Sequence, residues 1–273
     1  MEYEPFSVAI SVYKSDNPDY FDRALESITD NQTIKPNEIV LVVDGPVPES
    51  INKVINKYIE KCVFKVIRLE KNGGLGNALR IATENCSYEL IARMDSDDIS
   101  VPDRFEQELI AFRDNQVDVV GGDITEFVGE ENNVVAKRVV PLGDKRIKKE
   151  MRNRCSMNHV TVMMRRTALF KSGGYLDWFC NEDYYLWIRM CLNNCVFANT
   201  GTTLVNVRTG LDMYARRGGK KYFSSEAKLQ KYMLRVKFIS IFRFWLNIFK
   251  RFVVQLILPN RLRGFVYKTI ARK

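Results

Sequence analysis

Apolar runs alternate with helical patterns in the first part of the chain, and this alternation limits the fold more than any other feature. The runs FSVAISVY, EIVLVVD, VFKVIRL and YELIARMD alternate with helical patterns near residues 19–30, 49–61, 75–86 and 102–114. Strands that alternate with helices form βαβ units around a mainly parallel sheet. The chain is therefore predicted to be an α/β protein, and its 273 residues, 46% of them hydrophobic, can bury a full core.

The pattern changes after this alternation. Shorter β-rich segments, VDVVGG, VVAKRVV and HVTVMM, predict a mixed sheet between residues 117 and 164. A helix is expected at NEDYYLWIRMCLN, followed by strands at VFANT and TLVNVR. DMYARRGGKKY is predicted to be a basic loop that leads into the remaining tail.

Basic residues are concentrated at the carboxyl end. Residues 228–273 hold twelve Lys or Arg and no acidic residue, and the formal net charge of the chain is +9. Localised positive charge indicates an anionic partner, such as nucleic acid, an anionic lipid surface or a phosphorylated substrate. Six cysteines without a CxxC pair and a single histidine do not favour a zinc site. Without a signal-peptide pattern or a run of about 18 uncharged apolar residues, we expect a cytoplasmic protein with no membrane-spanning helix.

Three carboxylates follow the fourth apolar run, in RMDSDDIS. Ligands of parallel sheets bind beyond the carboxyl ends of the strands, where Asp44 also lies. Asp95 and Asp97 are two positions apart, so on an extended segment they point the same way and can bind Mg²⁺ or Mn²⁺ together. Alternatively, Asp98 or Ser100 caps a helix that starts near Pro102. These residues alone leave the two interpretations equally balanced.

Two further segments carry candidate site residues. The glycine-rich turn in KNGGLGNALRIA can bring backbone N–H groups close to a nucleotide, although a plain tight turn explains its glycines as well. In CNEDYYLW, Glu182 and Asp183 are adjacent and diverge by about 100° on a helix. Asp183 shares a face with Trp187, which could stack on a sugar ring. Stabilisation of the first helical turn is the alternative role, and it suits Glu182 better than Asp183.

In this order, SVAISVYKSD, EIVLVVDG, KNGGLGNALRIA, YELIARMDSDDISVPDRFEQE and NEDYYLWIRM resemble the family 2 glycosyltransferases of the GT-A fold, over roughly residues 6–210. The bacterial enzymes that build O-antigen, capsule or exopolysaccharide are the most similar type. The resemblance implies a metal-dependent, inverting transfer of a hexose from a UDP-sugar to a glycan hydroxyl, with Mn²⁺ or Mg²⁺ as cofactor. It implies a catalytic domain at 1–215, with a nucleotide-binding half at about 1–100 and an acceptor half at about 101–215, and a basic loop and amphipathic helical tail at 216–273.

The resemblance also implies roles for single residues. Asp183 matches the catalytic base, Asp95 and Asp97 match the D-x-D that contacts ribose and the metal-bound diphosphate, and Asp98 is their usual neighbour. Asp44 matches the aspartate that accepts from uracil N3–H, although Val43 stands where the family often has a second aspartate. The predicted nucleotide-sugar-binding residues are Ser11, Tyr13, Asp44, Asn72, Gly74, Asn77, Arg93, Asp95 and Asp97.

Four other residues each have two possible roles. His159 is the only histidine, and a structural role competes with a contact to donor phosphate or acceptor. Arg216 and Arg217 could close over the diphosphate as a lid, or belong to a solvated basic loop. Arg93 could reach a phosphate, but packing or a surface salt bridge is the expected role.

The tail combines a narrow polar stripe with a wide apolar surface between residues 237 and 255. This surface requires a cover: the catalytic domain, a second copy of the chain, or a membrane interface. Unopposed basic residues and Trp245 favour an anionic membrane on the inner face of the cell membrane, whereas the apolar face is too wide for nucleic acid. A membrane contact would bring the enzyme to an undecaprenyl-diphosphate-linked acceptor. The rival functions are a sugar nucleotidyltransferase and a non-catalytic nucleotide-sugar or membrane-binding module.

Overall fold

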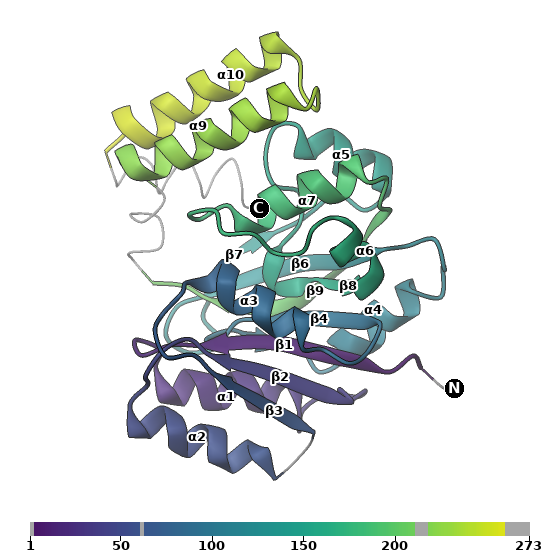
Figure 1. Ribbon diagram of the computed structural model, residues 1–273, viewed down its shortest axis with the longest axis vertical. Coiled ribbons are helices and arrows are strands. Elements are labelled where there is room, and N and C mark those ends of the chain that lie inside the picture. Colours follow the sequence, from purple (N-terminus) through teal and green to yellow (C-terminus); the bar gives the residue numbers. More distant parts are fainter. Residues whose placement is uncertain (1–2, 61–62, 211–217, 260–273) are drawn as a thin grey trace.

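The computed structural model describes residues 3–60, 63–210 and 218–259 (Figure 1). Nine strands in these ranges form one sheet in the order β3-β2-β1-β4-β8-β6-β9-β5, with β7 paired to β6. The strands are β1 (Phe6–Val12), β2 (Glu38–Val43), β3 (Phe64–Arg68), β4 (Leu90–Met94), β5 (Ile99–Ser100), β6 (Val119–Phe127), β7 (Val134–Arg138), β8 (Met163–Arg165) and β9 (Phe197–Arg208).

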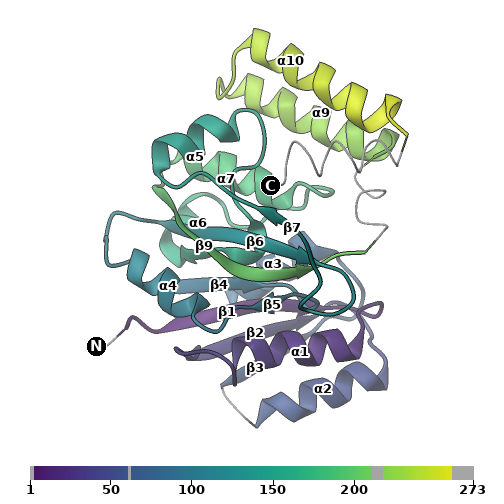
Figure 2. The same cartoon turned by 180° about the vertical axis from the view of Figure 1, so that it is seen from behind.

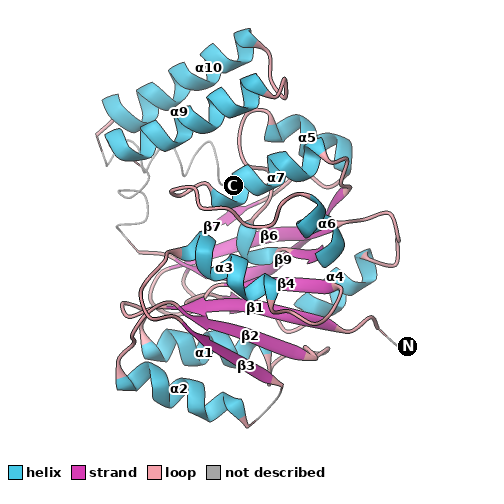
Figure 3. Ribbon diagram, viewed as in Figure 1, coloured by secondary structure: helices cyan, strands magenta, loops and turns pink. Residues whose placement is uncertain are grey.

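Helices cover the sheet on both faces (Figures 1 and 3). They are α1 (Pro18–Ile28), α2 (Glu49–Ile59), α3 (Leu75–Glu84), α4 (Arg104–Ala111), α5 (Asp144–Met151), α6 (Arg166–Lys171), α7 (Glu182–Leu192), α9 (Lys220–Arg235) and α10 (Ile241–Phe252), with short turns η1 (His159–Thr161) and η2 (Val253–Ile257).

The first half has the predicted βαβ architecture. Strands β3, β2, β1 and β4 are parallel neighbours, which confirms the α/β prediction. Alternate side chains of β1 enter two separate cores: Val8 and Ile10 pack with α1 and α2, while Ala9 packs with α3 and α7. Because both faces are covered (Figure 2), these strands read as continuous apolar runs rather than alternating ones.

The second half is a mixed sheet, also as predicted. β8 is antiparallel to β4 and β6, whereas β6 and β9 are parallel. Two details differ from the sequence-based expectation. VFANT and TLVNVR form the single strand β9, and His159 lies in η1 rather than at the start of a strand.

The capping interpretation of the acidic cluster is wrong. Helix α4 begins at Arg104 with Asp103 in the capping position, so neither Asp98 nor Ser100 is placed to cap it. Ser100 is part of β5, and Asp98 accepts a hydrogen bond from the backbone N–H of Arg208 at 2.8 Å. Asp98 therefore ties the end of β9 to the acidic loop.

The carboxyl-terminal helices form a pair, α9 and α10, beside α5 and α7 (Figure 1). Leu229 and Met233 of α9 are fully buried in the same core as α7. The sequence pattern did not reveal this helix, and the expected basic loop ends earlier, because Lys220 already belongs to α9. The predicted domain boundary at residue 216 lies outside the described residues. Helix α9 is thus an integral part of the fold.

Candidate functional site

The carboxyl end of β2 is joined to the glycine-rich turn before α3. The Asp44 carboxylate accepts hydrogen bonds from the backbone N–H groups of Gly73 (2.7 Å) and Gly74 (3.0 Å), and Asn72 donates to the Asp44 carbonyl (3.2 Å). A Cβ atom on Gly45 would lie 2.7 Å from the backbone nitrogen of Asn72, so only glycine allows this approach. Asp44 therefore fixes the turn, and its role toward uracil stays a prediction.

The remaining predicted nucleotide residues line the same edge of the sheet. Ser11 is half-buried near the end of β1, and Tyr13 just beyond it is 42% exposed. Gly74 precedes α3 with a φ of 84°, a left-handed value that suits glycine. Asn77 lies in the first turn of α3 and accepts from Arg80. These positions agree with the predicted nucleotide pocket.

The acidic cluster follows β4 at this edge. Arg93 is 3% exposed, and its guanidinium pairs through both terminal nitrogens with the Asp95 carboxylate. The expected salt bridge of Arg93 therefore exists, with the Arg93 side chain buried and the Asp95 side chain half-buried. Arg93 Nε has no hydrogen-bond partner among the described residues. The buried guanidinium of Arg93 consequently fixes the position of the Asp95 carboxylate.

Asp97, unlike Asp95, is exposed and is not paired with a cationic side chain among the described residues. Desolvation, followed by repulsion from Asp95 and Asp16, raises the pKa of Asp97 to about 6. Asp16 had not been expected here. It accepts from Ser96 Oγ at 2.8 Å and from the Tyr13 N–H at 3.1 Å, so the loop after β1 meets the acidic cluster.

A divalent cation would relieve this concentration of negative charge. No three His, Cys, Asp or Glu side chains in the described ranges cluster closely enough to hold a metal by themselves. Mg²⁺ often binds through one or two carboxylates, with substrate phosphates and water as its other ligands. Asp97, with Asp95 beside it, fits this mode of binding. The residues therefore suit a cation that arrives with a diphosphate.

Arg208 also joins the site, from a position far away in the sequence. Besides the bond from its N–H to Asp98, its Nε donates to the Asp97 carbonyl at 3.2 Å, and its guanidinium lies 3.8 Å from the Tyr20 ring centroid. Burial and the neighbouring carboxylates Asp95 and Asp97 raise the pKa of Asp98 well above its ordinary value. Asp98 therefore has a structural role. No local sequence signal indicates Arg208, because it meets the cluster only through sheet pairing.

The second acidic pair opens helix α7. As expected from helical geometry, the two side chains diverge. The Cβ of Glu182 lies 3.5 Å from the position a Cβ would take on Gly76 of α3, while Asp183 accepts from the Tyr184 N–H at 2.6 Å and lies 3.9 Å from Cys155 Sγ. Glu182 thus faces the nucleotide-binding half and Asp183 faces the segment before η1.

Arg93 connects this pair electrostatically to the acidic cluster. Burial, then the charge of Asp183, raises the pKa of Glu182 to about 7, and Arg93 and Asp95 also act on it. Burial raises the pKa of Asp183 as well, while the Tyr184 N–H and Arg93 lower it. Two acids with raised pKa values beside one buried cation are typical of a site for proton transfer.

Two predicted contact residues are structural instead. Trp187 is fully buried and packs edge-on against His159 and Phe197, so the suggestion that it stacks on a sugar is wrong: a helix face shared with Asp183 here points into the core. His159 Nε2 lies 2.8 Å from the Tyr175 hydroxyl. Burial and then Arg93 lower the pKa of His159 well below its ordinary value, so it is neutral. Arg216 and Arg217 lie outside the described residues.

Comparisons with known proteins concern the family and the fold of the chain. Residues 7–174 match the family described as glycosyl transferase family 2. The chain is 36% identical to an uncharacterised glycosyltransferase of Haemophilus influenzae, over 98% of this chain and 99% of the relative. It is 35% identical to a UDP-Gal:α-D-GlcNAc-diphosphoundecaprenol β-1,3-galactosyltransferase of Escherichia coli, over 98% and 97%. It is also 35% identical to the amylovoran biosynthesis glycosyltransferase AmsE of Erwinia amylovora, over 96% and 98%.

Solved structures share the fold. S. aureus TarS residues 1–349, crystallised with UDP-GlcNAc, superimposes with a TM-score of 0.66 at 19% identity, covering 97% of this chain and 76% of TarS 1–349. This likeness supports the GT-A architecture of the sheet and its helices. Together with the family match and the relatives over nearly their whole length, it establishes that the chain is a glycosyltransferase and belongs to glycosyl transferase family 2.

Proposed function

We propose that this enzyme transfers a hexose from a UDP-sugar to a hydroxyl of a lipid-diphosphate-linked glycan, with inversion at the anomeric carbon, in bacterial surface polysaccharide synthesis. The observation that carries the proposal is that three features occur around one edge of the sheet: the Asp44–glycine turn, the exposed Asp97 and the acidic pair of α7. The first two suit a nucleotide diphosphate, and the third suits an attacking hydroxyl.

The reaction is a single displacement. The acceptor oxygen forms a bond to the anomeric carbon as the bond from that carbon to the diphosphate breaks, and the hydroxyl proton passes to a carboxylate. We assign that carboxylate to Asp183, which is half-buried at the start of α7, where the helix dipole favours its ionised form. A Mg²⁺ or Mn²⁺ ion held by Asp97 and the phosphate oxygens would stabilise the charge on the leaving UDP.

The donor and acceptor are inferred from similarity. The E. coli relative is named for UDP-galactose and a GlcNAc-diphosphoundecaprenol acceptor, and a second E. coli relative, 27% identical over half of this chain, is named for UDP-glucose and the same acceptor. Both names describe β-1,3 transfer. We therefore propose a UDP-hexose donor and a sugar-diphosphate-lipid acceptor of this type.

The enzyme should be incubated with a panel of UDP-sugars, Mn²⁺ or Mg²⁺, and a short-chain lipid-diphosphate GlcNAc acceptor. We expect acceptor-dependent release of UDP and a glycosylated product by mass spectrometry. Exchange of labelled pyrophosphate into the UDP-sugar would indicate a nucleotidyltransferase instead. Binding of UDP-sugars without product from any of them would indicate a binding module.

Replacing Asp97 by asparagine should weaken donor binding. The exposed carboxylate is the protein ligand best placed for a cation, and its loss removes a charged contact worth roughly 1.5–3 kcal/mol, or about 10- to 100-fold in the Kd for UDP measured with Mn²⁺. Titration without metal provides the control, because the same substitution should then leave weak UDP binding unchanged or improved. Equal metal-dependent affinity in both proteins would remove Asp97 from the cation site.

Helix α10 supports a peripheral membrane contact. Its apolar side is outward: Phe242, Trp245 and Phe249 are 72%, 62% and 66% exposed. Its polar side is inward, since Asn247 donates to Gln230 Oε1 of α9 at 2.8 Å and Arg251 pairs with Glu226. The helix lies on the outside of the molecule (Figures 1 and 2). Within the described residues, every helix is too short or too polar to cross a bilayer.

Because the polar side of α10 packs against α9, the catalytic domain does not cover the apolar side of this helix. An amphipathic helix with Trp and basic residues is suited to a lipid interface. We propose that the face formed by Ile241, Phe242, Trp245, Leu246, Phe249 and Phe252 enters an anionic membrane surface and places the site near its lipid-linked acceptor.

A triple variant with Phe242, Trp245 and Phe249 replaced by serine should lose most of its binding to anionic vesicles. Burial of one such side chain contributes about 1.5–3 kcal/mol, so the loss should exceed roughly 100-fold in the sedimentation assay. The double variant Val134→Ser/Val135→Ser, at exposed apolar positions of β7, is the matched control. Unchanged vesicle binding, or a shift from dimer to monomer instead, would contradict the membrane contact.

A further inference from the structure

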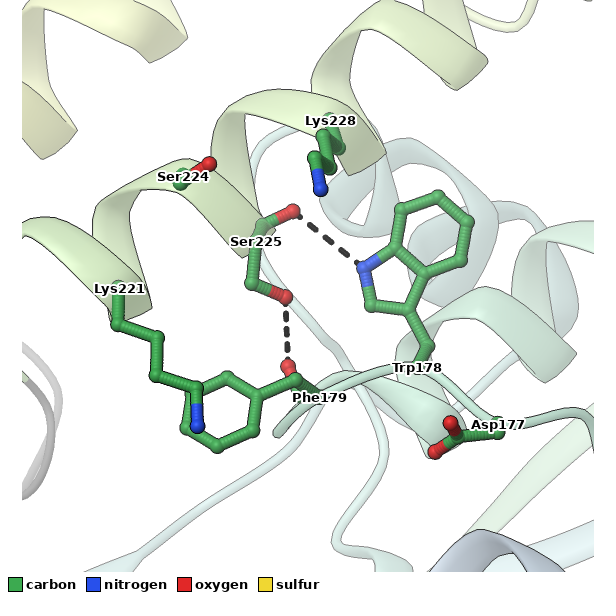
Figure 4. Close-up of a pocket in the computed structure, with 7 residues that line it drawn as sticks. All are labelled: Asp177, Trp178, Phe179, Lys221, Ser224, Ser225 and Lys228. Carbon is green, nitrogen blue, oxygen red and sulfur yellow. Dashed lines mark hydrogen bonds between the residues drawn. The ribbon is translucent and has the colours of Figure 1, made fainter.

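A pocket separate from the proposed donor edge lies between α9 and the loop that precedes α7. Its volume is about 420 Å³. The loop supplies one wall and residues 221–228 of α9 supply the other (Figure 4). The lining residues are Asp177, Trp178, Phe179, Lys221, Ser224, Ser225 and Lys228.

Two lysines dominate the charge of this pocket. Lys221 and Lys228 are seven residues apart on α9, so they share a face at a separation of about 10 Å along the axis. Lys221 Nζ lies 4.1 Å from the centroid of the Phe179 ring. Asp177 is the one acidic lining residue, and Figure 4 shows it across the pocket from Lys221. Two flexible ammonium groups over an aromatic wall suit an anion with several charged oxygens.

Hydrogen bonds connect the wall of the pocket to the residue that precedes the acidic pair of α7. Ser225 Oγ donates to the Phe179 carbonyl at 2.5 Å and accepts from Asn181 Nδ2 at 3.3 Å, and Trp178 Nε1 donates to the Ser225 carbonyl at 3.3 Å. Asn181 directly precedes the Glu182–Asp183 pair. The ligand of this pocket would therefore be held at a fixed distance from the proposed base.

The pocket lies between α9 and the loop that leads to the proposed base. Glu182 and the backbone of Asp177 contact α3 of the nucleotide-binding half near Gly76, whereas Asn181 and Trp178 contact α9. Asp177 also lines the pocket, so its loop lies between α3 and α9. The two lysines belong to α9, whereas Asp97 follows β4. We therefore treat an anion bound by the lysines as a different group from the donor diphosphate.

We propose that Lys221 and Lys228 bind the diphosphate of the acceptor, between its sugar at the acidic pair and its lipid chain. This inference rests on the proposed function and adds the site by which the acceptor is recognised. A diphosphate needs cationic contacts and a hydroxyl donor, which the two lysines and Ser224 provide. The neighbouring helix α10, with its outward apolar face, lies next to α9 (Figure 1) on the route to the membrane.

The test compares acceptor and donor kinetics of the full chain. In the double variant Lys221→Ala/Lys228→Ala, we expect the KM for a short-chain lipid-diphosphate GlcNAc acceptor to rise roughly 10- to 100-fold, the effect of losing two charged contacts. The KM for the UDP-sugar and the Kd for UDP should not change. The matched control is Lys220→Ala/Lys231→Ala, which removes two exposed α9 lysines outside the pocket and should leave both KM values unchanged.

The acceptor itself provides a second comparison. An acceptor with a single phosphate should bind the unmodified enzyme more weakly than the diphosphate, and the double variant should discriminate less between them. An unchanged acceptor KM in a folded variant would overturn the proposal, as would a rise in the UDP-sugar KM, which would assign the lysines to the donor. If the unmodified enzyme transfers no sugar to any lipid-diphosphate acceptor, the proposed function fails instead, and that result is seen before any variant is made.

Discussion

Replacing Asp183 by asparagine is expected to lower kcat about 10²- to 10⁴-fold, the range of effect of a general base. Asparagine keeps the shape of the side chain and can still accept from the Tyr184 N–H, but it cannot take a proton. The Kd for UDP should be unchanged, because the contacts of Asp44 and Asp97 involve neither Asp183 nor its partners Tyr184 and Cys155. Calorimetric titration with UDP and steady-state kinetics of the same preparation would measure both.

Glu182→Gln is the matched control for this substitution. Glu182 is adjacent to Asp183, and burial raises the pKa of both carboxyl groups. Glu182 faces Gly76 rather than Cys155, so its neutral variant should lose far less turnover. If Glu182→Gln abolishes turnover while Asp183→Asn remains active, the base is Glu182 and the assignment must be reversed.

The pH dependence of kcat provides an independent check on the base. A base must be ionised, so turnover should fall as the pH is lowered through its pKa. Because burial raises the pKa of Asp183, this acid limb should lie above the ordinary aspartate range, near 3.9 in model peptides. A kcat that stays constant down to about pH 4 would contradict a buried carboxylate as base.

Truncation of the chain near residue 226 should abolish folding rather than release a soluble catalytic domain. The cut removes Leu229, Met233 and Ile239, which are 0%, 0% and 5% exposed in the core shared with α7. Large-to-small changes at such positions cost about 2–5 kcal/mol each, and a domain has about 5–15 kcal/mol in total. Circular dichroism should show no cooperative thermal transition in the truncated chain.

The same truncation also removes Arg251, the ion-pair partner of Glu226. If Glu226 remains in the shortened chain, loss of its partner costs roughly a further 3–5 kcal/mol. The Phe242, Trp245 and Phe249 triple variant is the control, because those side chains are exposed and should melt at nearly the unmodified temperature. A well-folded, active truncated chain would show that α9 is an appendage. A truncated chain is therefore unsuitable for testing the membrane contact of the tail.

The order of strands and helices in the first half could be predicted because β1, β2 and β4 are buried on both faces and each helix has one apolar stripe. The cluster at Asp95 and Asp97 could also be located, since it follows a strand directly and local spacing sets its direction. In both cases the prediction depends only on residues that are neighbours in the sequence. The repeat of 2 residues in a strand and of 3.6 residues in a helix determines which of their side chains share a face.

Contacts between distant segments could not be predicted in this way. Arg208 reaches Asp98 only because β9 pairs with β5 and β6. Trp187 shares a helix face with Asp183, but spacing does not reveal that η1 and β9 cover that face. The polar stripe of the tail was visible in the sequence, whereas its inward direction depends on Glu226 and Gln230 of α9. The lysine pocket likewise needs two segments separated by some forty residues of sequence.

The anomeric configuration of the product tests the central claim most directly. The enzyme, with the α-linked UDP-hexose that supports turnover and a lipid-diphosphate GlcNAc acceptor, would give a disaccharide whose new linkage is read by NMR spectroscopy. A single displacement with one carboxylate base predicts a β linkage. An α linkage would require a different reaction, and it would remove Asp183 from the role proposed for it.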